Sequence, residues 1–510
     1  MDLLLINPGN AQGIYQDLSN EYAAIEPPTW ALLLAESTRK KGFEVSILDC
    51  NAERLSHKSS LLRIDEINPK FICFVVYGQN VNAGTTSMSG TVSLSEYIKQ
   101  NSKRDYKIGV IGSYVQALPI KSLKEEKSID IVFTNEGVYA LNNILNLSDF
   151  NEKSLLKIRG IAFRGSSQIH INLPEKVVPH ERMDTDLPGY AWDLLPKKNK
   201  HFDLYRSPLW HAMYDENKRS PYAALQTSLG CQFGCNFCMI NIINRDDNEE
   251  IGVASNYSGM RYWSPSFIIK EFDKLISMGV KTIRIVDEMF LLNPKYYIPL
   301  CEMLSERNKN DELIMWAYSR IDTIRRPGIL DLVRKAGIKW LCLGIESGDR
   351  EIRLEVSKGK FLDVDVNTII KQVHDSDIEV MANYIYGLPG DTEKSIKKTY
   401  DLSLELCTSG WNTYPAMALP GSKLYKDAIE NNIKLPKSYE GYSFHSYDIQ
   451  PLPTDSLSPE RILELRDKAF TEYHTSQKFL NRINNRYGKI AVENILKMTK
   501  LKLKRKILGG

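Results

Sequence analysis

Short apolar runs rich in β-branched residues alternate with helix-compatible stretches in the first part of the chain. Continuous runs such as residues 71–76 (FICFVV) are typical of strands that are buried on both faces. The Pro-Pro pair at 27–28 opens a helical stretch that ends at Gly42. The predicted strands are residues 2–7, 44–49, 71–76, 107–111 and 130–134. This alternation predicts a doubly wound, Rossmann-like α/β domain with a parallel sheet over residues 1–145.

The same alternation returns after residue 220. The predicted strands are residues 222–229, 281–286, 313–317, 340–344, 379–386 and 411–418. The helices between them are predicted at residues 264–278, 294–307, 327–336, 363–376 and 392–407. Six βα units suit an open, partial (β/α)6 barrel of the TIM type, in which chemistry takes place at the C-terminal ends of the strands.

Three of the eight cysteines crowd into one short segment, GCQFGCNFC, with the spacing CxxxCxxC at Cys231, Cys235 and Cys238. Three thiolates on one glycine-bearing loop can converge on one metal centre. A structural zinc site normally needs four protein ligands. An iron–sulfur cube is held by cysteine thiolates, and with three of them one iron keeps an open position. A zinc knuckle, or three cysteines in one loop by accident, is the alternative interpretation.

The overall composition excludes several classes of protein. The 510 residues include 66 basic and 63 acidic ones, so the net charge of +3 indicates neither a nucleic-acid nor a membrane partner. The start has an acid, Asp2, where a signal peptide needs basic residues, and no window reaches the roughly 18 apolar residues of a membrane span. We therefore expect a cytoplasmic protein, in which disulfides are rare. The five scattered cysteines are expected to be packing residues.

The connector and the C-terminal end carry weaker patterns. Residues 146–220 contain a predicted hairpin, at 158–163 and 170–173, and a proline-rich linker that Trp192, Tyr205 and Trp210 are expected to anchor. Residues 426–510 are predicted to be mostly helical. The aromatic loop at 439–447 is expected to pack on the barrel rather than to line a substrate pocket. The basic run at 497–506 favours a solvated or frayed helix end over contact with an anionic surface.

The loops after the N-terminal strands are rich in Gly, Asn, Ser and Gln, and they contain neither GxGxxG nor GxxxxGK[ST]. A dinucleotide or ATP is therefore disfavoured. The segments PPTWALLLAESTRKKGFEVSILD, IGSYVQALP and DIVFTNEG resemble the cobalamin-binding domain that precedes the barrel in one class of radical S-adenosylmethionine (SAM) enzymes. The resemblance implies cobalamin contacts at Asn10, Tyr77, Gln79, Asn80, Gly112, Ser113, Glu136 and Gly137.

One departure from that family concerns the lower face of cobalamin. Members that replace the lower axial base carry a histidine in a DxHxxG loop after the first strand. Residues 7–13 read NPGNAQG and contain no histidine. The lower face is then expected to meet water or one of Tyr77, Gln79 and Asn80.

The cysteine segment, with an aromatic residue before its third cysteine, resembles the radical SAM signature. This resemblance implies a 4Fe–4S cluster on Cys231, Cys235 and Cys238, with SAM on the open iron. The implied SAM contacts are Phe237 near the adenine, Asp287 or Glu288 at the ammonium group, Arg320 at a carboxylate of SAM or substrate, Glu346 or Ser347 near the ribose, and Gly387 and Pro389 in a GxPG turn. Residues 358–359 correspond to a Lys-Gly turn of the family. Each of these is alone a weak motif, because an acid at a strand end is often a helix cap and GxPG is often only a turn.

The sequence therefore predicts a cobalamin-dependent radical SAM enzyme that methylates an unactivated carbon. Radical cyclisation or rearrangement without methyl transfer is the alternative within the same architecture, and a non-catalytic metal-binding scaffold is the alternative from another class. The predicted division is 1–145 cobalamin domain, 146–220 hairpin and linker, 221–425 radical SAM barrel and 426–510 helical region. The expected partners are a small-molecule or biosynthetic-intermediate substrate and an electron donor such as flavodoxin or ferredoxin; nucleic acid is disfavoured.

Overall fold

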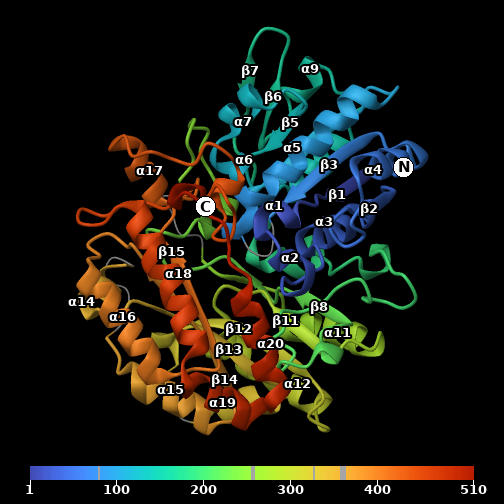
Figure 1. The fold of residues 1–510 in the computed structure, drawn as a ribbon. Helices are drawn as coiled ribbons and strands as arrows, with labels where there is room; N and C mark the ends of the chain where they lie inside the picture. The colour runs from blue at the N-terminus through green and yellow to red at the C-terminus, as the bar shows by residue number, and fades with distance from the viewer. Residues whose placement is uncertain (78–80, 254–258, 325–327, 357–362) are drawn as a thin grey trace.

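The computed structural model describes residues 1–77, 81–253, 259–324, 328–356 and 363–510. Two largely parallel sheets organise these residues. In Figure 1 the N-terminal sheet and its helices, in blue and teal, lie above the second sheet, in green to orange. The predicted α/β class, with two separate parallel sheets and a helical C-terminal region, is confirmed.

The N-terminal sheet has seven strands in the order β2-β1-β3-β4-β5-β6-β7. The strands are β1 Leu3–Asn7, β2 Val45–Asp49, β3 Phe71–Val76, β4 Lys107–Gly112, β5 Ile131–Phe133, β6 Ile161–Arg164 and β7 Ile169–Ile171. The first five are parallel, as their apolar runs predict, whereas β6 and β7 are antiparallel. The predicted hairpin thus forms, and it extends this sheet beyond β5.

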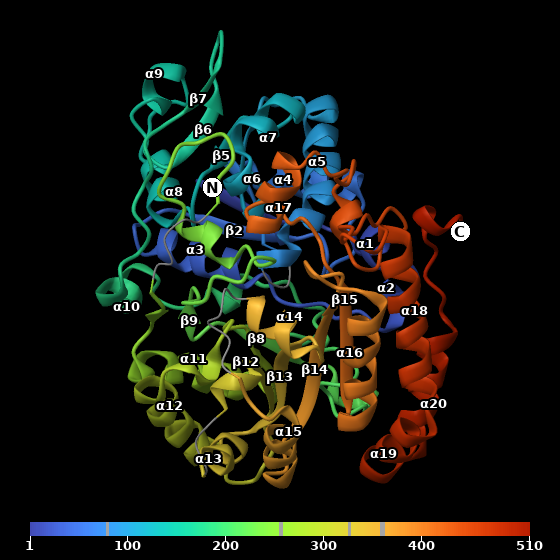
Figure 2. The ribbon, with the colours of Figure 1, turned by 90° about the vertical axis from the view of Figure 1, so that its left-hand side faces the viewer.

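Helices cover both faces of this sheet (Figures 1 and 2). They are α1 Ala11–Tyr15, α2 Leu18–Glu21, α3 Thr29–Arg39, α4 His57–Ile67, α5 Gly84–Asn101, α6 Ser113–Ala117, α7 Pro119–Glu125, α8 Val138–Leu145 and α9 Glu152–Leu155. Every residue of β3 is buried, which explains its uninterrupted apolar sequence.

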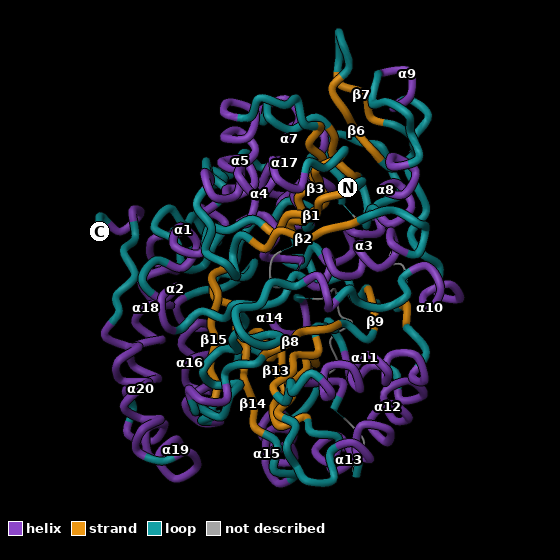
Figure 3. Tube along the Cα trace, turned by 90° about the vertical axis from the view of Figure 1, so that its right-hand side faces the viewer, coloured by secondary structure: helices purple, strands orange, loops and turns teal. Residues whose placement is uncertain are grey.

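The second sheet has six parallel strands in the order β15-β14-β13-β12-β11-β8. The strands are β8 Tyr222–Leu225, β11 Thr282–Ile285, β12 Ile314–Arg320, β13 Ile338–Glu346, β14 Glu379–Tyr386 and β15 Gly410–Pro415. The order follows the chain, and β8 and β15 are the two edges, so the sheet forms the predicted open, partial barrel. Figure 3 shows these strands as an inner group with helices outside.

The barrel helices lie close to the predicted positions. They are α11 Pro265–Ser277, α12 Pro294–Arg307, α13 Ile329–Lys335, α14 Arg350–Glu355, α15 Val366–Asp375, α16 Glu393–Leu406 and α17 Lys423–Glu430. The single strand predicted at 222–229 is wrong. The chain leaves β8 after Leu225 and forms β9 Ser228–Leu229, which pairs with β10 Arg261–Tyr262. The backbone N–H of Thr227, in the break, donates to Asp287 instead of to a strand.

The connector is held to both layers by aromatic side chains, as predicted. It includes the short helix α10 Met183–Asp186. The indole N–H of Trp192 donates to Glu271 of α11 at 2.9 Å. The hydroxyl of Tyr205 donates to Asp49 of β2 at 2.9 Å. These bonds tie the linker to the barrel helices and to the N-terminal sheet.

The C-terminal helices α18 Pro459–Thr475, α19 Gln477–Tyr487 and α20 Lys489–Lys500 run alongside the β15 edge of the barrel (Figure 2). The expectation of a solvated or frayed end for residues 497–506 is wrong at Arg505. Its guanidinium is buried, pairs with Asp467 at 3.0 Å and donates to the carbonyl of Phe444 at 3.0 Å. Among the residues that the structure describes, every helix falls short of the length and apolar character needed to cross a bilayer.

Candidate functional site

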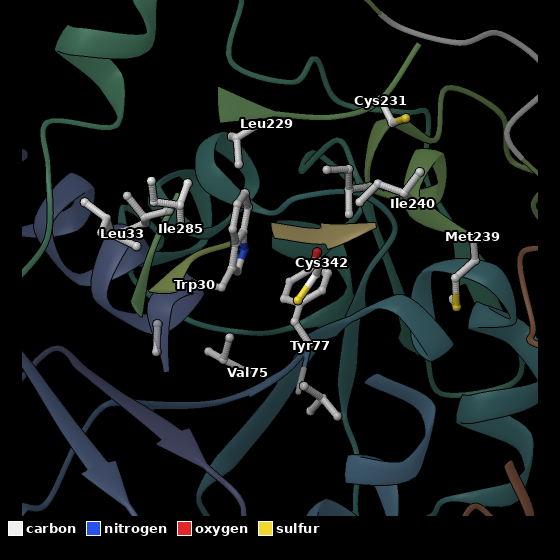
Figure 4. Close-up of a cluster of buried hydrophobic side chains, with 14 of the residues drawn as sticks. Trp30, Leu33, Val75, Tyr77, Leu229, Cys231, Met239, Ile240, Ile285 and Cys342 are labelled. Carbon is white, nitrogen blue, oxygen red and sulfur yellow. The ribbon is translucent and has the colours of Figure 1, made fainter. Parts of the chain in front are cut away.

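The three clustered cysteines lie in a tight loop directly after β9. Gly230 turns the chain there with a φ of +89°, a conformation that favours glycine. Cys231 is buried, Cys235 and Cys238 are half-buried, and the N–H of Cys238 donates to the carbonyl of Cys235 at 3.1 Å. Figure 4 shows Cys231 at the edge of a cluster of buried apolar side chains that also includes Trp30 and Val75 of the N-terminal domain. The start of the loop therefore borders the core that joins the two layers.

The surroundings of the loop suit a cluster with several irons. Burial raises the pKa of the Cys231 thiol to about 11 and that of Cys235 to about 12, and it raises the pKa of Cys238 further; each thiol also responds to the charge of its neighbours. Bound metal overcomes such shifts, because thiolates are its ligands. A structural zinc normally takes four protein ligands, whereas an iron–sulfur cube held by three thiolates keeps one iron open, so a set of three cysteines fits a cluster better than a lone zinc.

A side chain of the N-terminal domain also contacts the loop. Asn82 lies in the turn between β3 and α5, and its amide nitrogen donates to the Sγ of Cys238 at 3.7 Å. Its amide oxygen accepts from the N–H of Met239 at 3.1 Å. Asn82 therefore links the N-terminal sheet to the third cysteine. Sequence analysis missed it because a single Asn in a turn carries no motif.

The two acids after β11 have different environments. Asp287 is buried and accepts from the N–H and hydroxyl of Thr227 and from the hydroxyl of Ser228. It therefore fixes the break between β8 and β9. Glu288 lies near enough to the cysteine loop for its charge to raise the pKa of Cys231 and Cys238, and burial raises its own pKa to about 7.

The arginine that ends β12 is held rigidly beside the loop. Arg320 forms two bonds to Asp322, at 2.8 and 2.6 Å. Its guanidinium lies 3.8 Å from the ring centre of Phe233, within the cysteine segment. This geometry fixes a positive charge next to Cys231 and Cys235, whose pKa values it lowers against the effect of burial.

Glu346, the acid that ends β13, has an unusual backbone conformation. The register with β14 shifts between Gly344 and Glu346, and Glu346 has a φ of +65°, which is rare for a residue with a side chain. Its charge acts on Cys235, and burial raises its pKa to about 7. Ser347 is fully buried, and its hydroxyl accepts from the N–H of Asp349 at 3.1 Å. Of this pair, Glu346 faces the cysteines and Ser347 shapes the loop.

The GxPG turn after β14 is stabilised from within. Gly387 has a φ of +82°, and its N–H donates to Asp391 at 3.0 Å. Pro389 is exposed at the tip of the turn. Thr392 caps α16 by a capping box with Ser395, as its position predicts. Phe237 of the cysteine segment is half-buried against the apolar core. The Lys-Gly turn predicted at 358–359 lies outside the described residues.

A cavity of about 360 Å³ opens at the carboxyl ends of β1 and β2. Its lining includes Asn7, Asn10 and Gln12 of the first loop, and Asn51 after β2. The amide of Asn10 also donates to Glu440 at 3.1 Å, which joins this loop to the C-terminal region. Polar and apolar side chains both line the wall, and its charged residues are Glu26 and Arg54.

The other predicted cobalamin residues that are described lie outside this lining. Tyr77 is buried and accepts a hydrogen bond from Gln116. Gly112 and Ser113 lie where β4 meets α6, and a side chain at Gly112 would meet the carbonyl of Val76 at 2.4 Å. Glu136 forms a buried ion pair with Arg261 at 2.8 Å, and Gly137 follows with a φ of +83°. Gln79 and Asn80 lie outside the described residues.

A second cavity, of about 450 Å³, lies inside the partial barrel. Arg284 of β11 and Trp316 of β12 line it, together with Leu501 and Lys502 of the C-terminal tail. Of the aromatic loop at 439–447, His445 lines this cavity, whereas Phe444 packs on Tyr414. Sequence analysis missed Arg284; the signal was a basic residue within the apolar run KTIRIV.

Comparisons with known proteins agree with this geometry. Residues 225–403, which include all three cysteines of the loop, match the Radical SAM superfamily. The chain is 23% identical to the uncharacterized methyltransferase PH0819 of Pyrococcus horikoshii over 94% of both chains. It is 22% identical to the anaerobic magnesium-protoporphyrin IX monomethyl ester cyclase of Cereibacter sphaeroides, over 82% of this chain and 61% of the cyclase.

Solved structures extend the similarity to the whole fold. The radical SAM methyltransferase TsrM of Kitasatospora setae, solved with cobalamin and a [4Fe-4S] cluster, has a TM-score of 0.64 at 15% identity and covers 98% of this chain and 99% of its own. The cobalamin-dependent radical enzyme OxsB has a TM-score of 0.62 at 14% identity, over 98% of this chain and 71% of its own.

Residues 225–403 form a radical SAM domain, and such a domain implies a 4Fe–4S cluster and SAM as cofactors. The chain as a whole shares its fold with TsrM and OxsB. The resemblance found in the sequence is thereby confirmed.

Proposed function

We propose that this chain is a cobalamin-dependent radical SAM enzyme that transfers a methyl group to an unactivated carbon of a small-molecule substrate. The observation that carries the proposal is the arrangement of three cysteines on one loop, one buried and two half-buried, with Glu288 and Glu346 near them at the ends of two barrel strands. Relatives named as methyltransferases, and the fold shared with TsrM, support the choice of methyl transfer.

In this proposal Cys231, Cys235 and Cys238 hold the cluster. Glu288 pairs with the ammonium group of SAM, Glu346 binds its ribose, and Arg320 binds its carboxylate. Phe237, Gly387 and Pro389 remain proposed contacts of the adenine and methionine. When bound, the cluster and SAM supply a 5′-deoxyadenosyl radical, and cobalamin supplies the methyl group.

The N-terminal cavity is the proposed cobalamin site, with Asn10 in its wall. The Asn and Gln side chains in its wall suit the many amide groups of a corrin. Tyr77, Gly112, Ser113, Glu136 and Gly137 stay proposed contacts, and Tyr77 or water remains the proposed neighbour of the lower face. The division at residues 145, 220 and 425, a cytoplasmic location and a flavodoxin or ferredoxin as reductant also belong to the proposal.

Anaerobic reconstitution tests the proposal. The chain should bind about four irons and, with dithionite, convert SAM into 5′-deoxyadenosine. A triple Ala variant of the loop cysteines should lose both properties, while Cys301→Ala, a matched buried cysteine in α12, should keep them. Addition of cobalamin should not change iron content but should be required for methyl transfer. A colourless chain that leaves SAM intact would favour a scaffold.

Radical cyclisation is the second candidate. Three of the relatives similar to this chain are anaerobic magnesium-protoporphyrin IX monomethyl ester cyclases. Mass spectrometry separates the two reactions: a methylated product gains about 14 Da, whereas a cyclised product gains no carbon.

A further inference from the structure

The barrel cavity has an aromatic wall that the proposed SAM contacts do not use. Its volume of about 450 Å³ falls within the range of about 300–1,000 Å³ that is usual for small-molecule sites. Trp210, Trp316, Tyr318, Trp411 and Tyr414 line it. Flat side chains of this kind suit a planar, largely apolar ligand.

One charged residue in this wall has unused hydrogen-bonding capacity. Arg284 is 2% exposed; its Nη1 donates to Glu26 at 2.5 Å, and its guanidinium lies 4.6 Å from the ring centre of Trp316. Its Nε and Nη2 have no hydrogen-bond partner in the part of the chain that the structure describes. These two N–H groups form one edge of the guanidinium plane, whose fork matches the two oxygens of a carboxylate.

The other unsatisfied atoms of the wall have the same polarity. Besides Arg284, the buried side-chain atoms of the wall that lack a partner among the described residues are the indole nitrogens of Trp316 and Trp411. All of these atoms are donors. A buried donor without an acceptor costs free energy, which a ligand oxygen would recover.

The charged residues of the wall also favour an anionic ligand. Arg284, Arg466 and Lys502 oppose only Glu26 and Asp467. The two histidines of the wall do not reverse this balance, because burial lowers the pKa of His445 to about 3 and of His474 to about 4 and keeps both neutral.

The cavity is placed between the proposed cofactor sites. Arg284 lies on β11 and Glu288 follows that strand, and the charge of Arg284 lowers the pKa of Glu288 against the effect of burial. At its other end the cavity shares Tyr15, Ala23, Ala24 and Glu26 with the N-terminal cavity. A molecule in the barrel cavity would therefore lie beside both.

We propose that this cavity is the substrate site and that it takes a planar, largely apolar carboxylate, which the Nε and Nη2 edge of Arg284 binds in a bidentate manner. The inference rests on the proposed function for the reaction, but its test needs no cofactor, so the two can fail separately.

The test uses two probes of equal shape, 2-naphthoate and its neutral analogue 2-naphthamide, with the full-length chain. Quenching of tryptophan fluorescence reports binding, since three tryptophans line the cavity. We expect 2-naphthoate to bind about tenfold more tightly or better, because a charged bidentate contact is lost with the amide. Arg284→Gln should abolish this preference, and Arg284→Lys should lose most of it, since lysine has no fork.

The matched control is Arg353→Gln. Arg353 is also buried and has an unpartnered Nε among the described residues, but it lies outside the cavity wall. It should leave the preference unchanged. If circular dichroism shows that Arg284→Gln does not fold, the double variant Glu26→Gln/Arg284→Gln takes its place in the test, because it removes both charges of the ion pair. Equal binding of the two probes by the wild-type chain, no binding of either, or a preference that survives the loss of Arg284 would overturn the inference.

Discussion

The two sheets of this molecule are built alike, but the acids at the ends of their strands differ in whether the protein pairs them with a cation. Both are largely parallel, and both gather loops at the carboxyl ends of their strands. In the N-terminal domain the acid Glu136 is neutralised by Arg261, and the cavity wall is mostly uncharged, with Glu26 and Arg54 as its charged residues. In the barrel, Glu288 and Glu346 keep pKa values of about 7 beside the cysteines. An acid at a strand end therefore indicates a ligand site only where the protein itself does not pair it.

The largest expected effect concerns the paired acid. Arg261→Gln leaves Glu136 buried without its cation, so the free energy of unfolding should fall by about 3–5 kcal/mol in urea titrations. Glu136→Gln/Arg261→Gln should recover most of that loss. If Arg261→Gln instead kept its stability but bound cobalamin more weakly, Glu136 would be a ligand contact. The difference in charge pairing between the two sheets would then disappear.

The next prediction separates the two neighbouring acids of β11. Glu288→Gln should weaken SAM binding about tenfold or more, measured by calorimetry on the reconstituted enzyme, because it removes the charge that is proposed to pair with the ammonium group. Asp287→Asn should leave SAM affinity unchanged but lower the free energy of unfolding by about 2 kcal/mol, since Asp287 holds Thr227 and Ser228. The reverse pattern would assign the ammonium group to Asp287.

Much of this arrangement could be predicted from the sequence. The alternation of apolar runs with helix-compatible stretches located the strands of both sheets, and the spacing of the cysteines located the loop. The difference between Asp287 and Glu288 could not be predicted, because it depends on hydrogen bonds to a break in β8 that local patterns do not show. The partnership of Glu26 with Arg284 joins residues 258 positions apart, and the burial of Arg505 depends on Asp467 of α18. Local periodicity carries no signal for such distant pairs.

A pH titration sharpens the contrast further. Burial raises the pKa values of Glu288 and Glu346 from 4.5 to about 7, so both are mainly neutral at pH 6 and ionised at pH 8. SAM affinity should therefore rise with pH, by at most about tenfold per pH unit for each group below pH 7. The folded chain binds these protons more tightly than the unfolded chain does, so their contribution to stability without cofactors should fall as pH rises from 4.5 to 7. Glu288→Gln should flatten both dependences; a SAM affinity independent of pH would contradict the assignment.

The smallest expected effect concerns Asn82, the contact between the N-terminal sheet and the cysteine loop. An N–H donor to a cluster sulfur stabilises the reduced, more negative state. Asn82→Ala should therefore lower the midpoint potential of the reconstituted cluster by on the order of 40 mV, the equivalent of ~1 kcal/mol. Asn10→Ala, in the same domain but in the cavity wall, should leave the potential unchanged. Equal potentials in the wild type and Asn82→Ala would show that this contact does not tune the cluster.

The central claim is that Cys231, Cys235 and Cys238 bind an iron–sulfur cluster and leave one iron open to SAM. Electron paramagnetic resonance of the reduced, reconstituted chain, recorded before and after addition of SAM, tests this most directly. The account predicts a cluster signal whose g-values change when SAM is added, and no such signal in the triple Ala variant of the loop. A signal that SAM leaves unaltered would mean that the fourth iron is closed, and would contradict the account.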